Sequence, residues 1–411
     1  MTDQLAVWVD INGETVPVGT AYFTHRGSLA TAFGYRQDYL RRPDAYALDP
    51  SLPLYQGQHH VASLPGAFAD SAPDRWGRNL IRQRLRGRDQ STKARALTSV
   101  DFLTGVGDYT RQGALRFSAE GASDFLDPDS AVPKMIELPQ LLRAADHLAR
   151  DDHDFSDLKL LLAAGTATLG GARPKASVRD GDTLYIAKFG HHADNWDVMA
   201  WEKTAIDLAE LAGIATPRHS LHRVDGRGVL VLERFDREGS TRIGYVSAMT
   251  MIGGRDGGGH DYLDVIEELP DQGDQPAEDL AALWRRVAFS VAIHNTDDHL
   301  RNHGFLRTRG GWRLAPVFDI NPNPEAAEPR MTSIAGARVG AEEVDGLAVL
   351  AEACGIGPRQ AATILSEVLA ATAQWESVAA RNGIGASERS RFTSAFENLR
   401  PALTEFIAAS G

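Results

Sequence analysis

The 411-residue sequence predicts an α+β protein with a β-rich N-terminal part and a mainly helical C-terminal part. Three observations support this fold class: alternating apolar residues near the N-terminus, helical periodicity over much of the C-terminal half, and an ordinary globular composition that is 43% hydrophobic and 24% charged. A chain of this length is expected to form two or three domain-sized units. We place them at residues 1–125, 135–236 and 237–411.

The N-terminal region is expected to be a small antiparallel sheet. Residues 5–9 and 16–23 have strand patterns and flank Asn12-Gly13, a dipeptide that favours a tight hairpin turn. Residues 29–33 form a plausible third strand. The polar, turn-rich residues 120–133 then predict a linker to the next domain.

Residues 165–175 are rich in glycine and precede a strand that ends at Lys188. Glycine lets backbone N–H groups approach phosphate oxygens closely, although such loops also occur in ordinary turns. Lys188 strengthens the phosphate interpretation, and Lys175 is a second candidate cation. Glu202, fourteen residues after Lys188 in an amphipathic helix over 197–212, is expected either to pair with that lysine or to be a surface charge.

A buried strand over 229–236 leads directly into charged residues. Such an ending suits a hinge between two lobes. The backbone from Glu233 to Phe235 would there be able to hold an adenine edge.

Two later motifs carry the chemistry. Asp297 and Asn302 lie five residues apart, the interval found in protein-kinase catalytic loops between the Asp that handles the substrate hydroxyl and an Asn that binds metal. Asp319 closes a strand-like run over 312–319 and stands where a second metal-binding carboxylate is expected. Each residue alone could be a turn residue beside a buried strand, but their order and spacing together favour a kinase.

Composition excludes several classes. The formal net charge of −12 argues against DNA binding by the chain alone, because phosphate contacts need a basic face. The single cysteine, Cys354, cannot form an internal disulfide, which suits a reducing cytoplasm, and it has no His-Cys cluster around it. The N-terminus lacks a secretory signal pattern, and no apolar run is long enough to span a membrane.

Residues 341–374 and 388–410 are expected to be helical, with a break at Gly383-Ile384-Gly385.

The order of these parts resembles that of HipA-type bacterial serine/threonine kinases, the toxins of type II toxin–antitoxin pairs. The resemblance covers nearly the whole chain, and its most specific matches are Glu-Arg-Phe-Asp at 233–236 and Thr-Asp-Asp-His-Leu-Arg-Asn at 296–302. It implies a two-lobed protein-kinase-like fold of the kind shared with phosphoinositide kinases, with a β-rich N-terminal domain and a mainly helical C-terminal lobe.

The resemblance also implies roles for individual residues. Asp297 would be the catalytic base, and Asn302 and Asp319 would bind Mg²⁺. Thr168 and Thr166 are candidate autophosphorylation sites, where an added dianion beside the nucleotide phosphates would expel the loop. The implied ATP-binding residues are Gly170, Gly171, Ala172, Lys175, Lys188, Glu233, Arg234, Phe235 and His299.

The implied partners are a HipB-type helix-turn-helix antitoxin and a protein substrate, with an aminoacyl-tRNA synthetase as one such target. DNA would be contacted only through the antitoxin. Several positions depart from the family: Arg173-Pro174 replaces Gln-Glu, Thr168 replaces Ser, and residues 245–249 replace a Gln-Glu-Asp segment. These departures leave open a nucleotide-binding pseudokinase that acts as a co-repressor with a DNA-binding antitoxin. A small-molecule phosphotransferase is a third hypothesis, against which the β-rich N-terminal domain argues.

Overall fold

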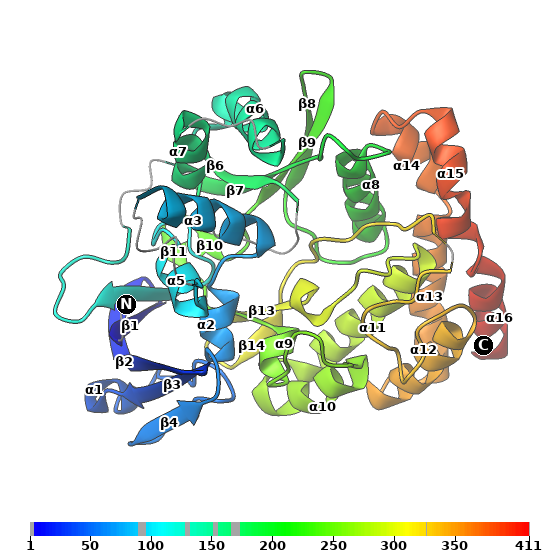
Figure 1. Cartoon of the computed structure of the whole chain (residues 1–411). Coiled ribbons are helices and arrows are strands. Elements are labelled where there is room, and N and C mark those ends of the chain that lie inside the picture. Colours follow the sequence, from blue (N-terminus) through cyan, green and yellow to red (C-terminus); the bar gives the residue numbers. More distant parts are fainter. Residues whose placement is uncertain are drawn as a thin grey trace. The chain divides into compact units, whose positions relative to one another are not determined.

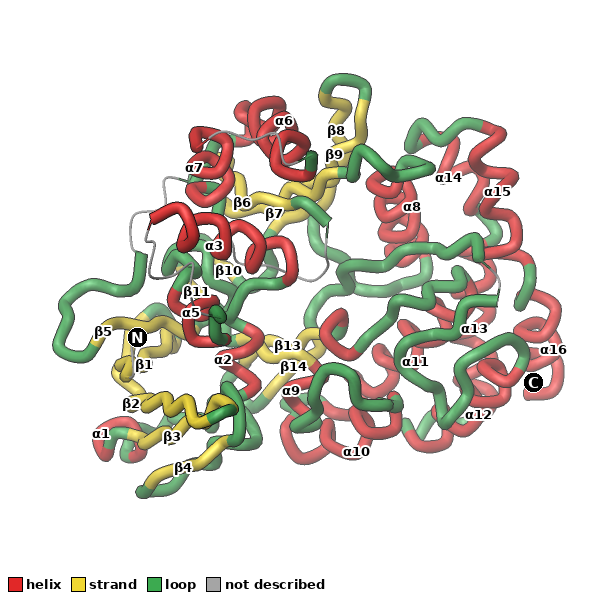
Figure 2. Tube along the Cα trace, in the orientation of Figure 1, coloured by secondary structure: helices red, strands yellow, loops and turns green. Residues whose placement is uncertain are grey.

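The computed structural model describes residues 4–88, 96–127, 132–150, 155–165, 173–325 and 327–410. Contacts group the chain into two compact units. The first comprises Met1–Ala193 with Val224–Gly253, and the second comprises Asp194–Arg223 with Gly254–Gly411. The three domain ranges expected from the sequence stay a prediction. Most strands lie in the first unit and helices dominate the second, which confirms the α+β class (Figure 2).

The first unit begins with a five-stranded antiparallel sheet of order β4-β3-β2-β1-β5 (Figure 1). The predicted hairpin is confirmed: Asn12 and Gly13 join the first two strands with φ of 51° and 84°, the region that this dipeptide tolerates. Side chains of the first strand alternate between buried and half-buried, as expected for a sheet with one covered face. The strands are β1 (Gln4–Ile11), β2 (Glu14–Arg26), β3 (Ser28–Tyr35), β4 (Gln58–Val61) and β5 (Leu115–Ala119).

Short helices connect the outer strands of this sheet. The last of them starts with a capping box, in which the Thr98 side chain accepts from Asp101 N while the Asp101 carboxylate accepts from Thr98 N. This cap fixes where the chain turns toward β5. The helices are α1 (Gln37–Leu40), α2 (Gly66–Asp70), α3 (Arg75–Arg88) and α5 (Ser99–Thr104).

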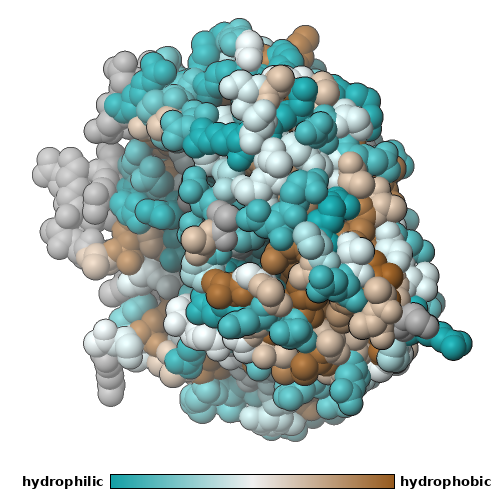
Figure 3. Space-filling model, turned by 90° about the vertical axis from the view of Figure 1, so that its right-hand side faces the viewer, coloured by the Kyte–Doolittle hydropathy of each residue, from teal (hydrophilic) through white to brown (hydrophobic). Residues whose placement is uncertain are grey.

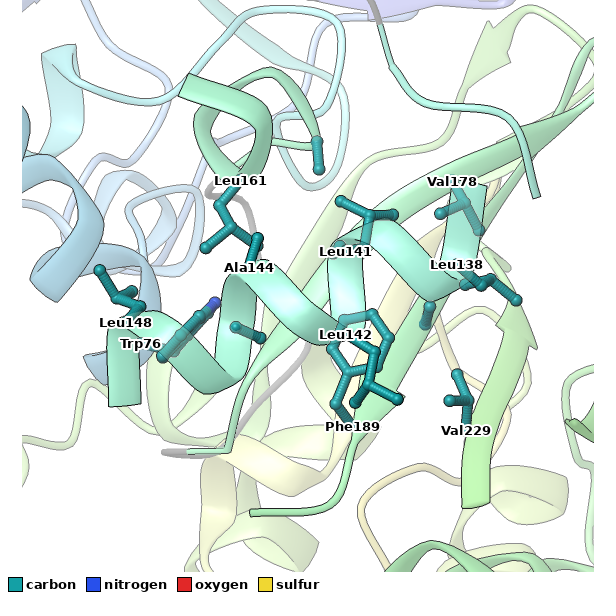
Figure 4. Packing of buried hydrophobic residues seen from close by; sticks show 14 of the residues in the cluster. Trp76, Leu138, Leu141, Leu142, Ala144, Leu148, Leu161, Val178, Phe189 and Val229 are labelled. Atoms are coloured by element: carbon teal, nitrogen blue, oxygen red, sulfur yellow. The ribbon is translucent and has the colours of Figure 1, made fainter. Parts of the chain in front are cut away.

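A second sheet in the same unit contains β6 (Lys175–Asp180), β7 (Thr183–Phe189) and β9 (Arg227–Glu233), all antiparallel. One face is covered by α6 (Leu138–Ala149) and α7 (Phe155–Ala163), preceded by the 3-10 turn Met135–Glu137. Figure 4 shows the resulting core. Its labelled residues are Trp76, Leu138, Leu141, Leu142, Ala144, Leu148, Leu161, Val178, Phe189 and Val229.

After β9 the first unit continues through small elements. A two-stranded hairpin is followed by one more short strand and one short helix. Ser247 caps that helix by accepting from Thr250 N. The elements are β10 (Arg237–Glu238), β11 (Thr241–Arg242), β12 (Tyr245–Ser247) and α9 (Ala248–Met251).

The second unit is mainly helical. Trp201 stacks on Phe392 with ring centroids 3.9 Å apart and on Trp375 at 6.3 Å, so α8 packs among the C-terminal helices. The helices are α8 (Val198–Leu211), α10 (Tyr262–Gln272), α11 (Pro276–Ala292), α12 (Glu342–Ala353), α13 (Pro358–Thr372), α14 (Trp375–Arg381), α15 (Ala386–Glu397) and α16 (Arg400–Ser410). Strand β8 (His219–Val224), the hairpin of β13 (Gly304–Arg307) and β14 (Trp312–Leu314), and the 3-10 turn Leu300–Asn302 complete the elements.

One expectation about this unit is corrected and another is confirmed. The strand-like run expected over 312–319 ends at Leu314. Pro316 lies just beyond the strand and has no N–H to donate to a ladder. The break expected at 383–385 is confirmed, because it separates α14, which ends at Arg381, from α15, which begins at Ala386. The helix α14 itself covers residues for which the sequence predicts no element.

The surface of the second unit is mixed. Figure 3 shows mostly polar residues on one face, with apolar residues in small groups between them. The large apolar side chains that stay more than half exposed include Leu211, Met331 and Val349. Cys354 is buried, and burial raises the pKa of its thiol to about 12, which makes it a poor nucleophile. Among the described residues, no helix is both long and apolar enough to cross a membrane.

Candidate functional site

The loop that carries Asp297 is held by the end of α11. The N–H of Ile293 donates to Phe289 O at 3.0 Å, which continues the helix by one residue. His294 then adopts a φ of 51°, a left-handed conformation that turns the chain out of the helix. Asn295 N folds back to Ser290 O at 2.8 Å. The loop therefore starts from a fixed point on a rigid, buried helix.

Asn302 ties the two ends of this loop together. Its side-chain Nδ2 donates to the main-chain oxygen of Asp297 at 3.1 Å, and its N–H donates to His299 O at 2.8 Å. The Asn302 side chain is buried, and its Oδ1 has no hydrogen-bond donor in the described part of the chain. A buried, unpartnered carbonyl oxygen is costly unless a ligand satisfies it, and oxygen is the ligand atom that Mg²⁺ prefers.

Asp319 lies in the same unit, five residues beyond β14. It has a φ of 57°, which is uncommon for a residue other than glycine. The side chain is half-buried. Its negative charge is close enough to Asp297 to raise the pKa of that carboxyl. Three oxygen-bearing side chains, those of Asp297, Asn302 and Asp319, are thus gathered in the second unit.

The pKa of Asp297 is raised although the residue is exposed at the surface. Crowding of its carboxyl by protein atoms has the largest effect. His299 opposes that shift, whereas the negative charges of Asp319, Asp298 and Glu328 add to it. A carboxylate with a raised pKa is a stronger proton acceptor than an ordinary one.

Beneath the loop lies a buried polar network that the sequence analysis missed. Asp298 Oδ2 accepts from Tyr262 Oη at 2.5 Å, and Asp298 Oδ1 contacts His303 Nε2 at 2.9 Å. Arg330 lies 3.9 Å from Asp298 and pairs with the buried Glu343 at 3.2 Å. Only His303 is close to Asp298 in sequence; the other members of the network come from α10, α12 and the segment after Asp319, so the sequence around Asp298 does not reveal them.

In the first unit, Lys175 and Lys188 are directly opposite each other in the β6–β7 ladder. Side chains of a strand alternate between faces, and Ala176, Val178, Ala187 and Phe189 face the core under α6. Both lysines therefore lie on the other face of the sheet. Like charges at such positions repel, so the pair favours an anion. Lys175 Nζ already donates to Asp74 Oδ2 at 2.7 Å and is 4% exposed.

The predicted hinge residues follow β9. Glu233 and Phe235 are half-buried, whereas Arg234 is buried. The N–H of Arg234 donates to Leu184 O at 3.0 Å, and its guanidinium forms a bidentate pair with Asp236 at 2.9 and 2.6 Å. Any adenine contact from this segment would therefore come from the backbone of its neighbours rather than from the Arg234 side chain.

Other predicted positions divide into two groups. Glu202 is 1% exposed, so the alternative that made it a surface charge is wrong. His299 is half-buried, and its Nδ1 has no hydrogen-bond partner among the described residues. The remaining predicted positions lie outside the described residues, namely Thr166, Thr168, Gly170, Gly171 and Ala172.

Comparison with known proteins identifies the family. Residues 167–375 match the model of the HipA-like C-terminal domain, and residues 9–118 match that of the HipA N-terminal domain. The chain belongs to the HipA family, as its sequence resemblance implied. Among curated proteins, none matches the sequence.

Two solved structures are similar to this one. A chain from the Shewanella oneidensis MR-1 complex of HipA, HipB and operator DNA aligns over 98% of this chain and 97% of its own length, with a TM-score of 0.69 and 15% identity. The Helicobacter pylori proinflammatory kinase CtkA aligns over 58% of this chain and 95% of its own length, with a TM-score of 0.41 and 15% identity. The first likeness supports the same fold along nearly the entire chain.

Proposed function

We propose that the chain is an ATP- and Mg²⁺-dependent serine/threonine kinase. The observation that carries the proposal is the loop in which Asn302 closes back on Asp297 while its own Oδ1 stays buried and unpartnered. Asp319, whose charge acts on Asp297, adds a second oxygen donor. Catalysis of phosphoryl transfer is mostly positioning and electrostatics, and this loop supplies both.

The donor set fits a hard divalent cation, because it consists of carboxylate and amide oxygens. Asn302 Oδ1 and the Asp319 carboxylate would hold the ion. When bound, Mg²⁺ would neutralise negative charge on the phosphates during transfer.

Asp297 would orient the acceptor hydroxyl and accept its proton. The hydrogen bond from Asn302 to Asp297 O fixes the backbone from which this carboxylate projects. Its raised pKa brings it closer to the working pH, which is the property that a general base needs.

ATP binding is proposed for the first unit. Lys188 would contact the phosphates, with Lys175 and the backbone of Gly170, Gly171 and Ala172 completing a phosphate loop. Backbone groups between Glu233 and Phe235 would contact the adenine. His299 is proposed as a further nucleotide-binding residue. Thr168 and Thr166 are the proposed autophosphorylation sites.

Family membership further supports a role as the toxin of a HipBA-type toxin–antitoxin module. The similar Shewanella oneidensis structure contains HipB and operator DNA. With a net charge of −12, the present chain would reach DNA through a basic HipB-type antitoxin rather than directly. Its substrate would be a protein Ser or Thr, with an aminoacyl-tRNA synthetase as the target class, and its phosphorylation would inhibit translation.

The proposal is tested by transfer of labelled γ-phosphate in the presence of Mg²⁺. Asp297→Gln and Asp319→Ala are each expected to abolish transfer, because one removes the proton acceptor and the other a metal ligand. Asp345→Asn, an exposed carboxylate on α12, is the matched control and should retain activity. Circular dichroism should show all three variants folded. Transfer that survives both Asp297→Gln and Asp319→Ala would overturn the assignment.

A second candidate is the nucleotide-binding pseudokinase co-repressor. The pairing of Lys175 with Asp74 favours it, because that ammonium is already engaged by protein. This candidate predicts ATP binding without transfer, and operator binding with the antitoxin that is unchanged by Asp297→Gln.

A further inference from the structure

The loop of residues 107–113, between α5 and β5, is far more buried than most surface connections. Thr110 and Arg111 are 0% exposed, and Asp108 and Gln112 are each 5% exposed. Arg111 has no carboxylate partner among the described contacts; its guanidinium donates to the main-chain oxygens of Ser71, Leu103 and Val106. Burying such a cation is expensive: the pKa of Arg111 is lowered to about 9, and burial is the largest cause of that shift. The cost suggests that this loop is held for a purpose beyond joining two elements.

One side of the loop is gripped by the predicted hinge. Arg234 Nη1 donates to Thr110 O at 2.6 Å, and Arg234 Nη2 donates to Arg111 O at 3.2 Å. In return, Gly113 N donates to Asp236 Oδ2 at 2.7 Å. The segment that follows β9 thus both donates hydrogen bonds to the loop and accepts one from it.

Two further arginines strengthen the grip. Arg237 Nη2 donates to Arg111 O at 2.6 Å and its Nη1 to Gly113 O at 3.1 Å, while Arg242 Nη2 donates to Asp108 O at 2.7 Å. Burial would raise the pKa of Asp236, but Arg234 and Arg237 lower it well below the usual carboxyl range. Asp236 is therefore an anion at all physiological pH values, and the network stays charged.

The other side of the loop touches the start of the glycine-rich segment. Gly165 has a φ of 84°, and a Cβ placed on it would lie 2.5–2.7 Å from three side-chain atoms of Thr110. The backbone of Gly165 thus packs directly against the Thr110 side chain. Its neighbour Ala164 is fixed in turn, since Ala164 O accepts from Ser177 N of β6 at 2.8 Å.

Thr110 therefore contacts two segments that are 69 residues apart in sequence, through its carbonyl on one side and its side chain on the other. From these contacts we infer that Thr110 is a positioning residue for nucleotide binding. It holds the predicted hinge and Gly165, the first residue of the glycine-rich segment, at a fixed separation. The loop before β5 would thereby set the affinity for ATP without contacting the nucleotide. The inference rests on the proposed kinase function.

A merely structural role would lower stability without changing nucleotide affinity selectively. A positioning role moves the KM for ATP more than kcat, because the groups that carry the chemistry lie in the catalytic loop and are not displaced. Affinity measured directly, with a fluorescent ATP analogue and Mg²⁺, reports the same property without depending on turnover.

The test compares Thr110→Ala with Thr110→Val in the full-length protein. Thr110→Ala keeps Cβ but removes Oγ1 and Cγ2, two of the three Thr110 atoms that pack on Gly165. We expect it to weaken ATP binding and raise the KM for ATP by about 2-fold to about 30-fold, the range for residues that couple sites without contacting ligand. Thr110→Val keeps the branched shape and is expected to restore the affinity. The matched control is Val18→Ala, which removes a similar side-chain volume from a 0% exposed position on β2. This strand belongs to the same sheet as β5, the strand that follows the Thr110 loop.

Val18→Ala should lower the melting temperature and leave the Kd for the analogue at the wild-type value. If Thr110→Ala folds poorly, Arg237→Lys tests the same loop, because it keeps the charge but loses the forked donation to Arg111 O and Gly113 O. Equal Kd values for wild type, Thr110→Ala and Arg237→Lys would overturn the inference. A wild-type protein that binds no nucleotide would instead overturn the proposed function, so the two failures are distinguishable.

Discussion

Asp297 combines surface exposure with an acid–base property that is usually found in buried carboxylates. Its pKa is raised by crowding and by the charges of Asp319, Asp298 and Glu328, against the opposing effect of His299. Because the proposed base must be deprotonated, acidification should stop the reaction at a higher pH than an ordinary Asp would allow. The site is therefore expected to lose activity early as the pH falls.

The charge of Glu328 offers a way to test this. Glu328→Gln removes one of the negative charges that raise the pKa of Asp297, so the acidic limb of the kcat/KM profile should move to lower pH. Glu325→Gln, three residues away and also exposed, is the matched control and should move the limb less. A limb that stays in place in Glu328→Gln would argue that Asp297 is not the titrating base.

The residues of this candidate site differed in how well the sequence alone predicted them. Asp297, Asn302 and Asp319 stood out because their spacing is fixed by a local loop and a short hairpin. Asp298 had the same local visibility, but its role depends on Tyr262, His303, Arg330 and Glu343, which only the folded chain brings together. No periodicity or spacing links those positions.

At the scale of elements, the proposed catalytic loop is held by two side-chain contacts across its own base. Asn302 reaches the carbonyl of Asp297, and His303 reaches the carboxylate of Asp298. The following segment joins the same structure, since Met331 N donates to Thr296 O at 2.8 Å. A loop held at this many points would keep its functional groups in place before substrate binds, and such positioning is the main source of rate in phosphoryl transfer.

The stability of that loop should depend on Asp298. Burial would raise its pKa, but His303, Arg330 and the hydrogen bond from Tyr262 lower it well below the usual carboxyl range. A lowered carboxyl pKa contributes stability above the unfolded-state pKa and loses it as the pH falls through the folded-state value. Asp298→Ala should thus cost about 3–5 kcal/mol at neutral pH, since it removes one partner from a buried charged network that includes Arg330.

Denaturant unfolding across pH measures this cost. The difference between wild type and Asp298→Ala should shrink in strong acid, where the wild-type carboxylate also becomes protonated. Tyr262→Phe removes one hydrogen bond to a charged group and should cost about 1.5–3 kcal/mol. A cost for Asp298→Ala below that of Tyr262→Phe would contradict the clamp.

Helices with strong apolar periodicity were predictable from the sequence. The end of a strand that depends on one residue, and a short helix that depends on tertiary packing, were not. The sequence indicated α8 because apolar residues recur along one face over several turns. It overextended β14, where Pro316 follows the last strand residues, and left α14 out. That helix is seven residues long and is stabilised by stacking of Trp375 on Phe396, with centroids 4.7 Å apart.

At the scale of the molecule, buried ionic contacts in the first unit join the N-terminal sheet to the β10–β11 hairpin that follows the proposed nucleotide-binding sheet. Asp108 pairs with Arg116 at 2.6 Å and with Arg242 at 3.1 Å. Buried ion pairs of this kind add little net stability but penalise any arrangement in which one partner is left alone. We therefore expect nucleotide binding to affect the N-terminal sheet, and changes in that sheet to affect nucleotide binding.

Ligand binding should be visible in the stability of the whole chain. ATP with Mg²⁺ at about 100 times its Kd should raise the free energy of unfolding by about 2.7 kcal/mol, because only the folded state binds. Chelation of the metal should remove most of this gain, since Asn302 and Asp319 would then face the phosphates without a cation. Equal stabilisation with and without Mg²⁺ would show that the metal is not held as proposed.

The central claim, that Asp297, Asn302 and Asp319 form a Mg²⁺-dependent phosphoryl-transfer centre, is tested most directly by incubation with Mg²⁺ and γ-labelled ATP, intact-mass measurement and peptide mapping. We predict phosphate on the chain, at Thr168 or Thr166, in the wild type and none in Asp297→Gln. Label in Asp297→Gln equal to that in the wild type would contradict the claim. Bound ATP without any transfer, to the chain or to an added protein substrate, would contradict it equally and favour the co-repressor.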